Sequence, residues 1–131
     1  MNRPKTTRKA LFISSIAFVL QGSWAVYANH RFGLEKSLVA GLVQGLCSFA
    51  MTFISTMILE YLLALWRALA PGIRLVAVVT VTTLIIALVQ STAHWIAGTP
   101  EIAITIAPAV ILGGVYCVVY AFGKMKFSPQ H

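Results

Sequence analysis

The sequence predicts an all-α membrane protein, a single domain of four transmembrane helices in an up-down bundle with both termini in the cytoplasm. Two observations lead to this prediction. Hydrophobic residues make up 59% of the 131-residue chain and charged residues only 10%, whereas charged residues make up roughly 25% of a soluble domain. The apolar residues also form four long blocks in place of the short alternating runs typical of core strands. We therefore expect most of the chain to lie in the lipid bilayer.

Short polar turns separate the four apolar blocks, and each block is long enough to cross about 30 Å of hydrocarbon. The expected spans are residues 10–29, 38–66, 75–97 and 102–122. The second span is roughly 43 Å long at 1.5 Å per residue, so its ends must tilt or leave the hydrocarbon. Before the last span, Thr99 is followed by Pro100 and Glu101, an order that predicts a helix start with Thr99 as the N-cap.

Lysine and arginine are distributed unevenly between the ends of these spans. One side of the membrane would carry Arg3, Lys5, Arg8, Lys9, Arg67, Arg74, Lys124 and Lys126, and the other side only Arg31 and Lys36. The positive-inside rule then places both termini in the cytoplasm, and we expect the membrane to be a bacterial cytoplasmic membrane. The net charge of +7 does not indicate a nucleic-acid partner, because the basic residues lie at the ends of apolar blocks and form no stripe on one face.

The first span has an alternative interpretation. A basic leader, an apolar stretch and small residues near Ala25 and Ala28 also resemble a cleaved secretory signal peptide. Cleavage would leave three spans with the new N-terminus outside. We favour an uncleaved span because the apolar stretch continues through Val26 and Tyr27.

Each of the first three spans contains one glutamine, Gln21, Gln44 and Gln90. Each lies roughly 9 to 12 Å from the outer end of its helix, so the three share a layer. His94 falls on the same helix face as Gln90 at about 100° per residue. In one interpretation the glutamines form interhelical hydrogen bonds that hold the bundle together, each contributing about 0.6 to 2 kcal/mol. Alternatively, they line a polar cavity that opens to the outer face, with His94 at its mouth, and receive a substrate headgroup.

Glu60 is the one acidic residue inside an expected span, which makes it a candidate proton carrier or cation site. It lies about two turns before Arg67, on a helix longer than the hydrocarbon is thick. Its carboxylate can therefore reach the inner interface and form an ion pair with Arg67 or with a neighbouring basic residue, Arg74 or Lys124. Both roles remain open from the sequence.

Two further features concern helix packing. Gly41 and Gly45 form a GxxxG pair, which permits close backbone approach either within the chain or in a dimer. Pro108 lies inside the fourth span and cannot donate a hydrogen bond to the carbonyl of Ile104. An unpaired carbonyl in lipid costs several kcal/mol. We therefore expect the helix to bend near Pro108 and one of the glutamines to approach the Ile104 carbonyl directly or through water.

The sequence contains no metal-ligand cluster, glycine-rich phosphate loop or nucleophile motif, so we expect no enzyme, cofactor or bound metal. In size, span number and topology the chain is similar to the GtrA-like proteins, which are implicated in moving lipid-linked sugars, and to the small multidrug-resistance transporters. It carries no extended motif of either family. The multidrug family has its essential glutamate in the first helix, so Glu60 in the second does not inherit that role. We assign the chain to neither family.

These features support two hypotheses about function. The chain is an oligomeric translocation module for a lipid-linked or amphipathic substrate, or it is a non-catalytic accessory or scaffold subunit of a larger membrane complex. Four spans alone enclose little volume. In either case we expect the chain to form a homo-oligomer or to bind a larger membrane protein.

Overall fold

The structure of the chain is a computed structural model that describes residues 3–127, with side chains from residue 7 onward. Its elements are helix α1 (Arg3–Ala28), the short 3₁₀ turn η1 (His30–Phe32) and helices α2 (Leu34–Leu65), α3 (Pro71–Ile96) and α4 (Ile102–Phe127). All four α-helices are long and apolar enough to span a membrane. The predicted all-α four-helix architecture is therefore confirmed.

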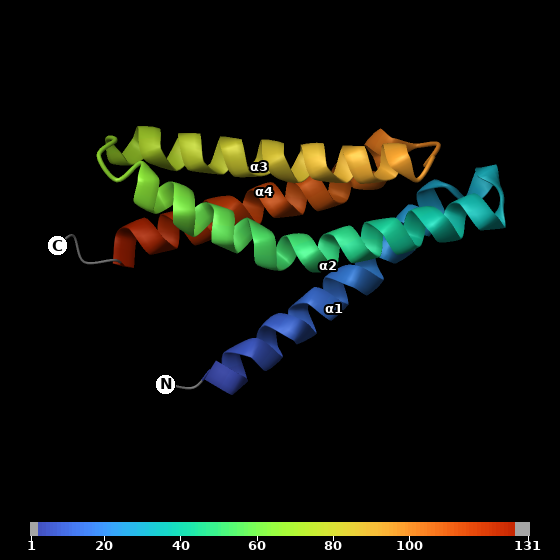
Figure 1. Ribbon diagram of the computed structural model, residues 1–131, viewed down its shortest axis with the longest axis horizontal. Coiled ribbons are helices and arrows are strands. Elements are labelled where there is room, and N and C mark those ends of the chain that lie inside the picture. Colours follow the sequence, from blue (N-terminus) through green and yellow to red (C-terminus); the bar gives the residue numbers. More distant parts are fainter. Residues whose placement is uncertain (1–2, 128–131) are drawn as a thin grey trace.

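Consecutive helices run in opposite directions, so the start of α1 and the end of α4 lie at the same end of the bundle (Figure 1). We call this the terminal end, and it also contains the α2–α3 turn. The distal end contains η1 and the α3–α4 turn. Each helix contains its expected span, except that residues 29, 66 and 97 fall just beyond the ends of the first three helices. With 32 residues, α2 is roughly 48 Å long and must tilt or leave the hydrocarbon at its ends.

Glycines bring α1 and α2 into close contact. A β-carbon added to Gly22 would lie 3.0 Å from the carbonyl oxygen of Gly41, and one added to Gly41 would collide with Val26. A β-carbon on Gly45 would lie 3.0 Å from the ring of Phe18. The Gly41 and Gly45 pair therefore forms a contact within the chain, as GxxxG pairs do when two helix backbones approach closely.

Beyond this crossing, the N-terminal half of α1 diverges from the other helices toward the terminal end (Figure 1). Its large apolar side chains stay exposed, among them Phe12 and Ile13. The buried hydrophobic core lies between α2, α3 and α4 and contains Met51, Leu59, Leu62, Leu63, Val78, Ile86, Cys117 and Ala121. The first half of α1 is thus an arm on the side of a three-helix core.

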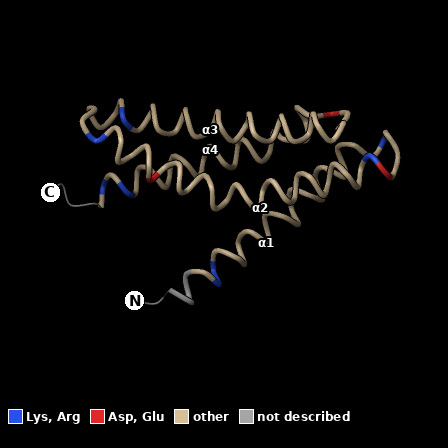
Figure 2. Tube along the Cα trace, viewed as in Figure 1, with Lys and Arg blue, Asp and Glu red and all other residues tan. Residues whose placement is uncertain are grey.

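Charged residues gather at the two ends of the bundle (Figure 2). The terminal end carries Arg8, Lys9, Arg67, Arg74, Lys124 and Lys126, with Glu60 nearby. The distal end carries Arg31 and Lys36 together with Glu35 and Glu101. The described basic residues are therefore divided between the two ends as the predicted topology requires. Which end faces the cytoplasm stays a prediction.

Candidate functional site

A chain of hydrogen-bonded polar side chains runs through the bundle interior from the distal end. The side-chain amide of Gln44 donates from Nε2 to Oε1 of Gln90 at 3.0 Å. Oε1 of Gln44 lies 2.6 Å from Nε2 of His94, and Nδ1 of His94 lies 2.8 Å from the hydroxyl of Thr99. Gln44 and His94 are fully buried and Gln90 is 2% exposed. Gln44 and Gln90 therefore join α2 to α3, as the packing interpretation expected.

The proton positions in this row of hydrogen-bonded side chains depend on one another. Because Oε1 of Gln44 faces Nε2 of His94, that ring nitrogen carries the proton and donates it. The other ring nitrogen then accepts from the Thr99 hydroxyl. A neutral His94 thus satisfies both of its partners, and no charge needs to be buried between the helices.

His94 does not lie at the mouth of an outward cavity, because it is fully buried and its ring is bonded to Thr99 in the turn after α3. Gly98 adopts a positive φ of 70°, and the backbone N–H groups of Thr99 and Gly98 donate to the carbonyls of His94 and Trp95 at 3.0 and 3.1 Å. This is a Schellman C-cap, which glycine favours because it has no β-carbon. It places the Thr99 hydroxyl on the imidazole instead of on the first turn of α4, so the prediction that Thr99 caps α4 was wrong.

Asn29, instead of Thr99, accepts the hydrogen bond from the backbone at the start of α4. Its side-chain oxygen accepts from the backbone N–H of Glu101 at 3.1 Å, and its nitrogen donates to the Thr105 hydroxyl at 2.8 Å and to the Ala25 carbonyl at 2.9 Å. Asn29 is fully buried. Sequence reasoning missed this residue. The one signal was an asparagine, a residue favoured at helix caps, at the end of an apolar span.

Pro108 frees the carbonyl of Ile104, and that carbonyl is satisfied by a different donor from the one expected. Helix α4 runs unbroken through the proline. The indole nitrogen of Trp24 on α1 donates to the Ile104 carbonyl at 2.9 Å. Among the described residues no hydrogen bond joins Gln21, Gln44 or Gln90 to this carbonyl, so the expected direct glutamine donor is replaced by Trp24.

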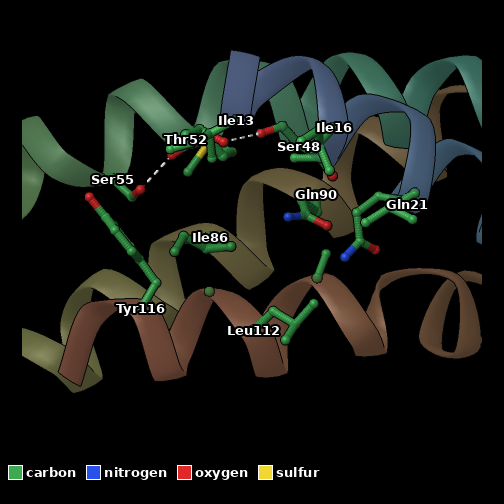
Figure 3. Close-up of a pocket in the computed structure, with 15 residues that line it drawn as sticks. Ile13, Ile16, Gln21, Ser48, Thr52, Ser55, Ile86, Gln90, Leu112 and Tyr116 are labelled. Carbon is green, nitrogen blue, oxygen red and sulfur yellow. Dashed lines mark hydrogen bonds between the residues drawn. The ribbon is translucent and has the colours of Figure 1, made fainter. Parts of the chain in front are cut away.

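Gln21 of α1 lies outside this row of hydrogen-bonded side chains and lines a crevice of about 330 Å³ between the middle of α1, from Ile13 to Gln21, and the other helices (Figure 3). Apolar side chains form most of its walls, among them Ile13, Ile16, Leu20, Met51, Ile86 and Leu112. Its polar groups are Gln21, Gln90, Ser48, Thr52, Ser55 and Tyr116. Gln21 is 8% exposed, and its Oε1 is buried without a hydrogen-bond partner among the described residues.

Glu60 lies away from this crevice, at the terminal end. Its Oε1 accepts from the Tyr120 hydroxyl at 2.5 Å and lies 3.0 Å from Nζ of Lys124. Arg67 falls in the turn after α2, whereas the last turns of α4 run beside Glu60, so Lys124 is the ionic partner instead of Arg67. Arg74 donates to the carbonyl of Leu63 at the end of α2. Both members of the ion pair are about half exposed, which fits an interfacial contact.

Comparisons with known protein families, with curated proteins and with solved structures find no match to this chain. In the part of the chain from residue 3 to residue 127, no group of three or more His, Cys, Asp or Glu side chains is placed to hold a metal ion. The inference about function therefore rests on the crevice and the polar chain behind it.

Proposed function

We propose that this chain is a small translocation module that binds an amphipathic molecule in the crevice beside α1. The observation that carries the proposal is the amide of Gln21, which is buried in an apolar crevice with an unpartnered oxygen. A buried acceptor without a partner costs about 1 to 3 kcal/mol. A ligand that donates a hydrogen bond to Gln21 would recover this free energy.

The shape of the crevice supports an amphipathic ligand. Ile13, Ile16, Leu20 and Leu112 line it and are 43 to 64% exposed, so its edges continue into the surface that faces lipid. The polar groups follow its length, from Ser55 and Tyr116 on the terminal side to the glutamines (Figure 3). A polar headgroup can occupy this row of polar groups while its hydrocarbon chain stays in the bilayer.

The two ends of the bundle suggest a direction of entry. The distal end is tied together by the bonds of Asn29 and Thr99, whereas α1 diverges toward the terminal end. In the orientation favoured by the positive-inside rule, the headgroup enters from the cytoplasmic leaflet, and we take the membrane to be a bacterial cytoplasmic membrane. A homo-oligomer or a larger membrane partner would enclose more volume than four helices can.

The test is transbilayer movement of tail-labelled fluorescent lipids in liposomes that contain the purified protein, followed by quenching with dithionite. Ala17 lines the crevice, and Ala17→Phe fills it. Ala50 is exposed on α2 away from the crevice, so Ala50→Phe is a matched control. We expect Ala17→Phe to slow movement and Ala50→Phe to leave it unchanged.

Equal rates in these two variants would contradict the proposal. The accessory-subunit hypothesis predicts a different pattern. In that case the isolated chain moves no lipid, and a larger membrane protein co-purifies with it in mild detergent.

A further inference from the structure

We infer that the amphipathic ligand has a small, uncharged headgroup that carries hydroxyl groups. This inference rests on the proposed function and specifies the chemistry of its ligand. It follows from the hydrogen-bonding state of the polar groups in the crevice, from the charge of its lining and from its volume.

Most of the polar atoms that line the crevice on α2 can accept but not donate. The Thr52 hydroxyl donates to the carbonyl of Ser48 at 2.8 Å, and the Ser55 hydroxyl donates to the carbonyl of Met51 at 2.5 Å. Each proton is therefore used within the helix, and the oxygen lone pairs remain for a ligand. Oε1 of Gln21 adds a third free acceptor (Figure 3).

The crevice also offers donors, the side-chain NH₂ groups of Gln21 and Gln90. Gln90 uses its Oε1 to accept from Gln44, which leaves its Nε2 group at the lining of the crevice. A hydroxyl group donates one hydrogen bond and accepts others, so a headgroup with two hydroxyls satisfies acceptors and donors together. An ester carbonyl could only accept, and it would leave the oxygens of Gln21 and Thr52 without a partner.

None of the described residues that line the crevice is charged. On α2 and α3 the nearest ionisable groups are unavailable, since His94 is bonded to Gln44 and Thr99, and Glu60 is bonded to Lys124 and Tyr120. On α1, Lys9 lies one turn before Ile13 but does not line the crevice. A phosphate or an ammonium group in the crevice would be removed from water without a counter-charge, which is strongly unfavourable. An uncharged headgroup avoids this cost.

The volume limits the size of the headgroup. About 330 Å³ lies at the lower end of the roughly 300 to 1,000 Å³ found for small-molecule sites. A glycerol-sized polyol with the first part of one hydrocarbon chain is therefore a suitable occupant. A large or branched headgroup would have to displace α1.

The inference can be tested with four probes that share an oleoyl or oleyl chain and differ in the headgroup. They are mono-oleoylglycerol, methyl oleate, oleylamine and oleoyl lysophosphatidic acid, and binding to the purified protein is measured by native mass spectrometry. We expect mono-oleoylglycerol to bind about tenfold more tightly than methyl oleate, as one or two recovered hydrogen bonds would give. The amine and the phosphate should bind more weakly than mono-oleoylglycerol.

Two threonines give a matched pair of variants. Thr52 lines the crevice and Thr92 is exposed on α3, and each hydroxyl donates to the carbonyl four residues earlier at 2.8 Å. Thr52→Val should weaken binding of mono-oleoylglycerol about threefold to tenfold and leave methyl oleate unchanged. Thr92→Val should change neither.

The outcomes separate this inference from the proposed function. Equal or tighter binding of methyl oleate, the amine or the phosphate, blocked by Ala17→Phe, would overturn the headgroup class and leave the site in place. Binding of all four probes that is insensitive to Ala17→Phe would overturn the site itself. Selective binding of mono-oleoylglycerol without its movement across liposomes would support the headgroup class and contradict the translocation proposal.

Discussion

Replacing Gln44 by leucine removes the central member of the polar chain. The change eliminates the bonds to Gln90 at 3.0 Å and to His94 at 2.6 Å. Interhelical hydrogen bonds in lipid contribute about 0.6 to 2 kcal/mol each. The variant also leaves a buried acceptor on Gln90 and a buried N–H on His94, and each orphaned group costs about 1 to 3 kcal/mol. The lost hydrogen bonds and the orphaned groups are two measures of the same change, so their costs are not added. We expect the free energy of unfolding to fall by about 2 to 4 kcal/mol.

Gln21→Leu is the matched control for this prediction. Gln21 is nearly as buried as Gln44, but its Oε1 has no partner among the described residues. Its replacement by leucine should leave the free energy of unfolding unchanged or raise it slightly, and should weaken ligand binding in the crevice. Unfolding by SDS in mixed micelles, monitored by circular dichroism, compares the two variants. Equal destabilisation by the two changes would refute the assignment of Gln44 to packing and of Gln21 to the crevice.

Three other predictions concern the remaining contacts. Trp24→Phe leaves the Ile104 carbonyl without its donor and should lower the free energy of unfolding by about 1 to 3 kcal/mol, and no loss in the SDS titration would show that another group satisfies the carbonyl. Glu60→Gln removes a half-exposed ion pair, so it should cost less than about 1 kcal/mol and preserve lipid movement, whereas loss of movement in a folded variant would indicate a coupling role. With the native cysteines replaced by alanine, a membrane-impermeant maleimide should label Lys36→Cys in intact cells and Lys126→Cys only after permeabilisation, and the reverse pattern would invert the topology.

The features that could be predicted from the sequence are those set by composition and by one helix at a time. Four apolar blocks of sufficient length predict four helices, because lipid requires each backbone polar group to be bonded within its segment. The depth of Gln44 and Gln90 follows from the helical rise alone. Their mutual bond was therefore foreseeable, and the structure contains it.

The features that were missed depend on how separate helices approach each other. Trp24 and Ile104 are 80 residues apart, and only the crossing of α1 with α4 makes the indole the donor. Asn29 reaches Glu101 for the same reason. Thr99 was assigned to the wrong helix, because a residue between two helices can serve the end of one or the start of the next. In this chain, Gly98 decides between them through its positive φ.

The close contact of Gly22 with α2 is the point about which the N-terminal part of α1 would tilt. Toward the distal end, the hydrogen bonds of Trp24 and Asn29 attach the other end of α1 to α4. Toward the terminal end, α1 diverges from the other helices (Figure 1). The segment of α1 from Gly22 back to residue 7, where the described side chains begin, is roughly 22 Å long at 1.5 Å per residue. A tilt of this segment by about 5° at Gly22 would move its far end by roughly 2 Å. A rotation of this size at the glycine contact would change the width of the crevice and leave the hydrogen bonds of Trp24 and Asn29 in place.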